Sequence, residues 1–210
     1  MWIAVEGNIG VGKSTLVRGL AKQMNWVEEG ENVETDSNFQ KHLSAFNNNT
    51  NHAIHLQRWL SSKRIRNART RKRQKENYVV ERSLLGDMVF TVTMHKRGYI
   101  EVNDYHNYLK EISNIFIKLP LPELVIYLKA DTETCYNRLK QRNRRQESSL
   151  EKSYIQELNF HYDNLLPTYT TLWDTPFIEI DFNQYKTSQE VEQIIKHNME
   201  KTNEVSTGTS

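Results

Sequence analysis

A glycine-rich segment near the amino terminus has the residue types and spacing needed to bind phosphate. Residues 7–15 read G-N-I-G-V-G-K-S-T, which fits the pattern G-x-x-x-x-G-K-[ST]. Glycines let successive backbone N–H groups turn inward around phosphate oxygens, while Lys13 can reach the terminal phosphates and the Ser14 hydroxyl can bind Mg²⁺. Thr15 is a second metal candidate. The residues expected to bind ATP here are Gly7, Asn8, Ile9, Gly10, Val11, Gly12, Lys13, Ser14 and Thr15.

An acid and an arginine follow the apolar segment 78–80. Ligands of open α/β sheets bind beyond the carboxyl ends of the strands, so Glu81 and Arg82 stand where a phosphoryl-transfer site would form. Glu81 can hold Mg²⁺ together with Ser14, or it can accept a proton. We therefore expect Glu81 and Arg82 to be catalytic residues beside Lys13.

An arginine-rich segment lies in the second half of the chain. Arg138, Arg142 and Arg144 precede Glu147, and a protein core cannot absorb so many guanidinium groups. We expect this segment, residues 138–147, to form a lid that closes over the phosphates and offsets the charge that develops during transfer. All three arginines are expected to bind ATP.

The spacing of apolar residues predicts the elements that position these groups. Short β-branched segments alternate with stretches of helical period, a pattern typical of a parallel sheet covered on both faces by helices. Strands are expected at Trp2–Val5, Trp26–Glu29, Tyr78–Val80, Leu124–Leu128 and Phe177–Ile180. Helices are expected at about 13–24, 38–46, 52–73, 87–96, 102–117, 132–142, 150–172 and 188–200. This predicts one α/β domain of the P-loop NTPase type over residues 1–200, with a five-stranded parallel sheet, and a polar, disordered tail over 201–210.

Composition and charge exclude several classes of protein. Apolar residues make up 37% of the 210 residues, and no apolar run approaches the ~18 residues of a membrane span. Because no secretory signal pattern opens the sequence, we expect a cytoplasmic protein. The net charge of +2 gives little reason to expect nucleic-acid binding, and the basic run 63–75 is interpreted as a solvated helix face, apart from Arg64. The N-K-x-D element of GTPases is absent from the sequence.

The order and spacing of the motifs resemble the deoxyribonucleoside kinase family, which includes deoxycytidine, deoxyguanosine and deoxyadenosine kinases and the herpesvirus-type thymidine kinases. The resemblance covers about residues 1–200. It rests on residues 7–15, on E-R-S at 81–83, on R-x-x-x-R-x-R-x-x-E at 138–147 and on D-F-N at 181–183. It implies a homodimeric enzyme that uses ATP and Mg²⁺ to phosphorylate the 5′-hydroxyl of a deoxynucleoside.

The resemblance also implies a role for each motif. Arg82 would steady the phosphates and the 5′-hydroxyl, and Glu81 would lie near Mg²⁺. In the lid, Arg142 and Arg144 would bind ATP, and Glu147 would reach the sugar. The adenine pocket would be lined, mainly through backbone groups, by Asp181, Phe182 and Asn183.

A glutamate after the second strand would act on the 5′-hydroxyl. The family usually carries E-P-V there, and the spacing from the glycine-rich loop points to Glu31, which is followed by asparagine instead of proline. Glu28 and Glu29 lie close enough to compete if the strand register is shifted. Glu31 is favoured as the general base and as a substrate contact, with the other two glutamates as alternatives.

The resemblance places further residues around the nucleoside. Gln57 falls where the family has a glutamine that bonds the base edge, and Arg64 lies on the same helical face. Asp87 has the spacing of relatives that accept purines or cytosine, so we expect these deoxynucleosides to be preferred over thymidine. Phe46 replaces a tyrosine that would contact the sugar. A deoxynucleoside monophosphate kinase and, more remotely, an ATPase stimulated by nucleic acid remain open as alternatives.

Overall fold

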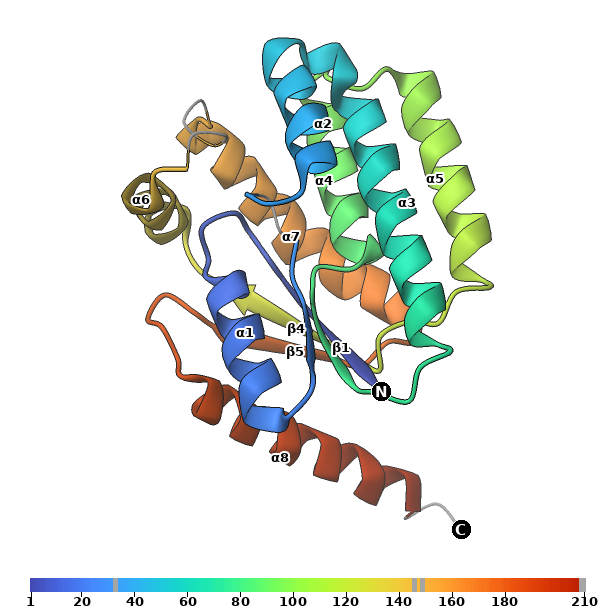
Figure 1. Cartoon of the computed structure of the whole chain (residues 1–210), viewed down its shortest axis with the longest axis vertical. Helices are drawn as coiled ribbons and strands as arrows, with labels where there is room; N and C mark the ends of the chain where they lie inside the picture. Colours follow the sequence, from blue (N-terminus) through green and yellow to red (C-terminus); the bar gives the residue numbers. More distant parts are fainter. Residues whose placement is uncertain (32–33, 145–146, 148–149, 208–210) are drawn as a thin grey trace.

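A computed structural model shows a five-stranded, fully parallel sheet between two layers of helices (Figure 1). The structure describes residues 1–31, 34–144, 147 and 150–207, with only the backbone described from residue 199 onward. All the predicted strands are present at their expected places. They are β1 (Trp2–Gly7), β2 (Val27–Glu29), β3 (Tyr78–Glu81), β4 (Leu124–Lys129) and β5 (Phe177–Asp181), in the spatial order β2-β3-β1-β4-β5.

The predicted helices are also present, with small shifts at their ends. They are α1 (Lys13–Met24), α2 (Ser37–Asn48), α3 (Ala53–Arg71), α4 (Leu84–Lys96), α5 (Val102–Phe116), α6 (Thr132–Arg142), α7 (Lys152–Leu172) and α8 (Ser188–Thr207). Helix α8 continues into the segment expected to be a tail, and residues 208–210 lie outside the described part of the chain. Among the residues that the structure describes, no helix is long and apolar enough to cross a membrane.

Two apolar cores, one on each face of the sheet, hold the layers together. Because successive side chains of a strand point to opposite faces, Ile3 and Val5 of β1 pack with α1, α6 and α8, while Trp2 and Ala4 pack with α3, α4, α5 and α7. Strand β1 is central and is buried along its whole length. The sheet is therefore a rigid support for the residues that follow the carboxyl ends of its strands.

The register of the central strands brings the two main motifs together. Val5 of β1 pairs with Glu81 of β3, so β1 enters the glycine-rich loop where β3 enters the Glu81–Arg82 segment. Strand β4 pairs with β1 on the other side and leads into α6, which begins the lid segment. Parallel pairing thus gathers the loop, the acid and the arginines at one edge of the sheet.

Candidate active site

The glycine-rich loop packs against backbone on one side. A Cβ atom at Gly10, where φ is +83°, would lie 2.2 Å from the carbonyl oxygen of Cys135 in α6. Only glycine permits both this left-handed conformation and this close approach. Lys13 closes the loop from inside, since its Nζ donates to the carbonyl oxygens of Gly7 at 3.1 Å and of Asn8 at 2.7 Å.

Lys13 is buried, and its charge is costly in the free protein. Lys13 is only 4% exposed. Burial and the nearby positive charge of Arg82 lower the pKa of Lys13 to about 7, although the carboxylates of Glu81, Glu31 and Glu6 act in the opposite direction. An incoming polyphosphate would supply the missing negative charge. The lysine is therefore poised to gain from binding an anion.

Two oxygen groups next to Lys13 suit a hard divalent cation. The Ser14 hydroxyl donates to Oε1 of Glu81 at 3.1 Å, so the two expected metal ligands are neighbours, whereas Thr15 is exposed. No group of three or more His, Cys, Asp or Glu side chains that could hold a metal occurs among the described residues. Mg²⁺ typically keeps several waters and takes one or two protein oxygens plus phosphate, so this pair fits it.

Arg82 turns from the strand into the pocket with an unusual backbone. Its φ is +67°, a left-handed value rarely adopted by residues other than glycine, and its Nη1 donates to the carbonyl oxygen of Gly7 at 3.0 Å and to the Tyr162 hydroxyl at 2.7 Å. The Tyr162 hydroxyl in turn donates to Glu6, which also accepts the backbone N–H of Ser83 at 2.6 Å. This buried network locks the strained turn in place.

Glu6 is a residue that the sequence analysis missed. It lies inside the apolar pattern of the first strand, is fully buried, and burial raises its pKa even though Arg82 and Ser83 oppose the shift. A Cβ atom at Gly86 would lie 2.3 Å from one of its oxygens, which explains the glycine at that position in α4. An acid in an otherwise apolar strand is the sequence signal that could have found it.

Glu31 lies between the guanidinium groups of Arg64 and Arg82. It accepts from Nη2 of Arg64 at 2.6 Å, and its Oε1 is 3.2 Å from Nε of Arg82. Burial alone would raise the pKa of Glu31, but Arg82, Arg64 and Lys13 together lower it to about 2. The carboxyl group is therefore ionised throughout the physiological pH range.

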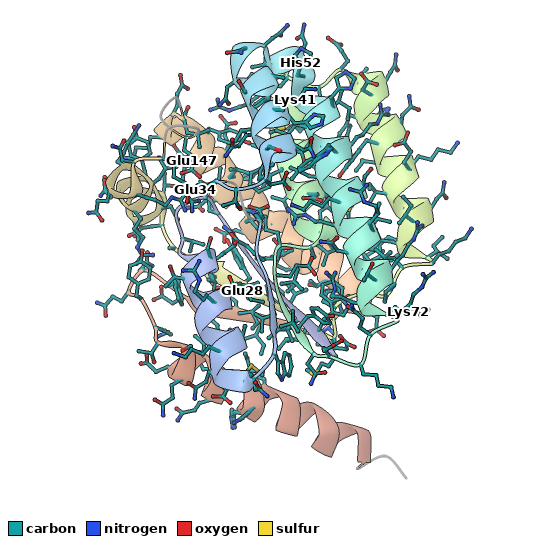
Figure 2. All side chains as sticks on the ribbon, in the orientation of Figure 1. Glu28, Glu34, Lys41, His52, Lys72 and Glu147 are labelled. Atoms are coloured by element: carbon teal, nitrogen blue, oxygen red, sulfur yellow. The ribbon has the colours of Figure 1, made fainter. Side chains whose placement is uncertain are left out.

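The competing glutamates face away from this cluster. Glu29 ends β2 and bonds Asn67 and Arg71, and Glu28 pairs with Arg18 at 3.7 Å near the surface. Figure 2 shows Glu28 beside α1, well apart from Glu34 and Glu147. Of the three candidates, Glu31 is the one that lines the pocket.

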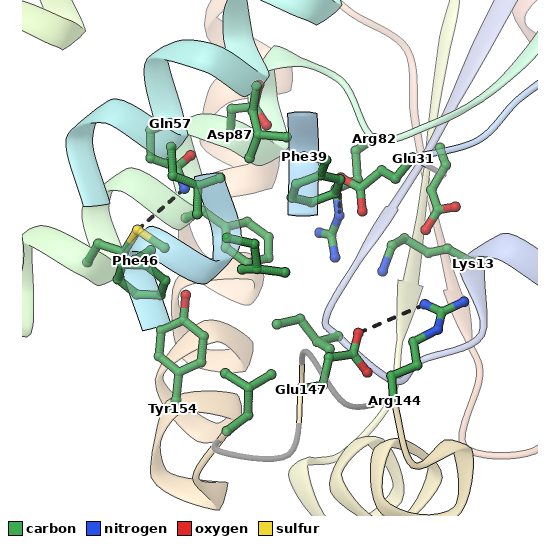
Figure 3. Close-up of a pocket in the computed structure, with 18 of the residues that line it drawn as sticks. Lys13, Glu31, Phe39, Phe46, Gln57, Arg82, Asp87, Arg144, Glu147 and Tyr154 are labelled. Atoms are coloured by element: carbon green, nitrogen blue, oxygen red, sulfur yellow. Dashed lines mark hydrogen bonds and ion pairs between the residues drawn. The ribbon is translucent and has the colours of Figure 1, made fainter. Parts of the chain in front are cut away.

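One cavity of about 120 Å³ joins these charged groups to an apolar chamber. Figure 3 shows Lys13 and Glu31 on one side and Gln57, Phe46 and Tyr154 on the other. Helices α2, α3, α4 and α7 form the chamber, and its apolar lining consists of Phe39, Leu43, Phe46, Leu56, Leu60, Phe90, Met94, Leu150 and Tyr154. A charged end and an aromatic end suit a ligand with a polar reacting group and a flat ring.

Gln57 stands at the aromatic end with unused hydrogen-bonding capacity. Its Nε2 reaches only the sulfur of Met94 at 3.4 Å, and its buried Oε1 has no hydrogen-bond partner among the described residues. A buried amide oxygen without a hydrogen-bond partner destabilises the protein unless a ligand donates a hydrogen bond to it. Beside it, Nε of Arg64 donates to both carboxylate oxygens of Asp87, at 2.8 and 2.9 Å.

Three described residues of the lid segment, Arg142, Arg144 and Glu147, line the charged end of the cavity. Arg142 pairs with Glu147, and Arg144 bonds Glu34 at 2.7 Å and approaches Glu147 at 3.9 Å, the contact drawn in Figure 3. Figure 2 shows Glu34 and Glu147 together at this side of the molecule. The guanidinium groups of both arginines are thus within reach of a ligand in the cavity, and their role as lid residues stays a prediction.

Arg138 is placed differently from the other lid arginines. It does not line the cavity, and its guanidinium donates to the backbone carbonyls of Val11, Phe182 and Asn183 at 2.8–3.0 Å. It therefore ties the glycine-rich loop to the segment after β5. Of that segment, Phe182 is buried, while Asp181 and Asn183 are exposed and lie outside the cavity lining.

Comparison with known proteins decides the family. A family model described as "Deoxynucleoside kinase" matches residues 3–203. The chain belongs to the deoxynucleoside kinase family. It is 32% identical over 165 residues to a deoxyadenosine/deoxycytidine kinase of Bacillus subtilis (strain 168), with 77% of this chain and 75% of that protein covered. It is 27% identical over 194 residues to a deoxyadenosine kinase of Dictyostelium discoideum, which covers 92% of this chain and 77% of that protein.

Solved structures agree with this assignment. A deoxyadenosine kinase from M. mycoides, determined with the products dCMP and dCDP, superposes with a TM-score of 0.78 at 25% identity, over 95% of this chain and 100% of that one. The fold predicted from the sequence is confirmed, and the protein is a kinase.

The fold of this deoxynucleoside kinase brings most of the expected site residues into one cavity. Gln57, Arg64 and Asp87 meet there although they come from two helices, and Phe46 forms part of its wall. Sequence reasoning missed Phe39, Phe90 and Tyr154, whose rings also line the cavity. Nothing in the sequence distinguishes these rings from ordinary core residues, because they follow the same helical period.

Proposed function

We propose that this kinase transfers the γ-phosphoryl group of ATP to the 5′-hydroxyl of a deoxynucleoside, with deoxyadenosine and deoxycytidine preferred over thymidine. One observation carries the proposal: a single cavity leads from Lys13 and Glu81 to the unsatisfied amide of Gln57. A phosphate donor at the first end and a nucleobase at the second would place the sugar hydroxyl between them, next to Glu31.

The charged end of the cavity supplies the electrostatics that phosphoryl transfer requires. Lys13 and the lid arginines Arg142 and Arg144 offset the negative charge that spreads over the transferred group. Ser14 and Glu81 would hold Mg²⁺, which neutralises phosphate charge when bound. Because Lys13, Glu81 and Arg82 are buried away from bulk water, their electrostatic interactions are stronger than they would be at the surface.

Glu31 acts on the acceptor hydroxyl. Since the pKa of Glu31 is lowered to about 2, the side chain is a weak base before transfer begins, and its first task is to accept a hydrogen bond and align the oxygen. As the bond from the 5′-oxygen to the γ-phosphorus forms, the bond from that phosphorus to the bridging oxygen breaks and ADP leaves. The hydroxyl becomes more acidic, and its proton moves to the Glu31 carboxylate. Nε of Arg82 lies 3.2 Å from Oε1 of Glu31 and holds the carboxylate in this orientation.

The polar groups of the chamber favour bases with an exocyclic amino group. Gln57 can accept from the amino group and donate to the ring nitrogen beside it, a pattern shared by adenine and cytosine. The carboxylate of Asp87 accepts from the same amino group, whereas it would face the carbonyl oxygen of thymine unfavourably. The names of the Bacillus subtilis and Dictyostelium discoideum relatives support the same preference.

A substrate panel tests the proposal. The four deoxynucleosides and their monophosphates are each incubated with γ-labelled ATP and Mg²⁺, and the products are separated. We expect labelled monophosphates from deoxyadenosine and deoxycytidine, with a lower kcat/KM for thymidine. Labelled diphosphates formed from the monophosphates would show a monophosphate kinase instead, and ATP hydrolysis stimulated by DNA or RNA without any labelled nucleotide would show a nucleic-acid-dependent ATPase.

A further inference from the structure

We propose that Asn159, on helix α7, is a positioning residue that holds the glycine-rich loop in its ATP-binding shape. The inference rests on the proposed use of ATP. Asn159 is outside the cavity lining and was not singled out by any motif. Its importance follows from a set of hydrogen bonds that run from the loop through α7 to the start of α6.

The first part of this set fixes the side chain of Asn8. Asn8 is only 1% exposed, and its Oδ1 accepts from the backbone N–H of Ile9 at 2.7 Å. Its Nδ2 donates both to the carbonyl oxygen of Ile155, at 2.8 Å, and to Oδ1 of Asn159. The amide of Asn8 thus has partners for its oxygen and for both of its N–H groups, which fixes its orientation.

The second part anchors Asn159 itself. Its Nδ2 donates to the carbonyl oxygen of Ala130 at 3.0 Å and to the Thr132 hydroxyl at 3.3 Å, at the junction of β4 and α6. Asn159 therefore links α7 to α6, the two helices that flank the lid. One side chain joins three segments that are distant in sequence.

The consequence for ATP passes through the backbone of Asn8. The carbonyl oxygen of this residue accepts the hydrogen bond from Nζ of Lys13 at 2.7 Å. A loop whose Asn8 is free to rotate would have to be ordered again when the phosphates bind, and that ordering cost would weaken binding. Asn159 acts through Asn8 and does not itself touch the nucleotide.

The test compares Asn159→Ala with Asn164→Ala. Asn164 lies on the same helix and is exposed, and its side-chain amide donates to the carbonyl oxygen of Phe160 one turn earlier, so it is a matched control. The dissociation constant for ATP is measured by calorimetry without an acceptor, and that for deoxyadenosine without ATP. We expect Asn159→Ala to weaken ATP binding on the order of tenfold to a hundredfold, with little change for deoxyadenosine and none in the control.

A double-mutant cycle with Asn8→Ala separates positioning from general stability. If Asn159 acts through Asn8, the double variant binds ATP no more weakly than the weaker single variant. Three results would each overturn the inference. The first is a double variant whose loss of ATP affinity equals the product of the two single losses. The others are equal losses of affinity for ATP and deoxyadenosine in Asn159→Ala, and an unchanged ATP affinity in a folded Asn159→Ala protein. If Asn159→Ala does not fold, Asn159→Leu, whose side chain has the same branched arrangement of heavy atoms but no polar group, takes its place. Because these are binding measurements, a protein that binds ATP but phosphorylates no deoxynucleoside would refute only the proposed function.

Discussion

Replacing Glu31 by glutamine should change both turnover and stability, because the carboxylate is a neighbour of two guanidinium groups as well as the expected acceptor of the hydroxyl proton. Loss of a general base typically costs 10²–10⁴-fold in rate. We expect kcat to fall on the order of 100-fold or more in Glu31→Gln, while the KM for the nucleoside changes less, since the amide still accepts a hydrogen bond.

The stability effect can be worked from the pKa of Glu31. A shift from 4.5 to about 2 favours the ionised form in the folded protein by on the order of 3 kcal/mol. A carboxyl group with a lowered folded pKa contributes stability above its unfolded pKa and loses it as pH falls through the folded value. Glu31→Gln should therefore lower Tm at neutral pH by about 6–12 °C, a difference that stays constant down to about pH 5 and shrinks below pH 4.5.

The assay follows ADP release with deoxyadenosine between pH 5 and 8, together with thermal unfolding across a wider pH range. Glu28→Gln is the control, since Glu28 lies outside the cavity and pairs with Arg18 at 3.7 Å near the surface. We expect its kcat and Tm to match those of the unaltered protein. A 100-fold loss in Glu28→Gln or Glu29→Gln, with normal turnover in Glu31→Gln, would refute the assignment of the base.

Three further predictions concern the two ends of the cavity. Lys13→Met should abolish phosphoryl transfer without lowering Tm at pH 7, because the lowered pKa of Lys13 means that its buried charge opposes folding. Turnover and thermal unfolding of the variant check this. Arg64→Met combined with Asp87→Ala should move the order of kcat/KM values toward thymidine, whereas Gln57→Ala should weaken all four deoxynucleosides; an unchanged order would place the pair outside base recognition. Arg144→Met should raise the KM for ATP several-fold without affecting the binding of deoxyadenosine alone, as measured by calorimetry.

Local patterns in the sequence were enough for the elements of the fold. The apolar runs beginning at Trp2, Tyr78 and Leu124 are buried central strands, and the run beginning at Phe177 is a half-buried edge strand. Their β-branched and aromatic composition favours strands over helices. One boundary shifted slightly: α7 begins at Lys152 and not at about residue 150, with Glu151 at the N-cap position but without a side-chain cap hydrogen bond. Helix α8 extends to Thr207 although the sequence there is polar and was expected to be a tail.

Tertiary structure, by contrast, decided which candidates line the cavity. The glycine-rich loop could be identified by sequence alone, because its function depends on backbone geometry that only closely spaced glycines allow. Glu31 could not be distinguished from Glu29 by sequence alone, because the two glutamates are close together in the chain and have the same side chain. Which of them faces the cavity depends on where Arg64 and Arg82 lie after folding. The hydrogen-bond partners of Glu6 and Asn159 were equally hidden. These partners are far away along the chain, and a hydrogen bond between distant segments leaves no local pattern in a sequence.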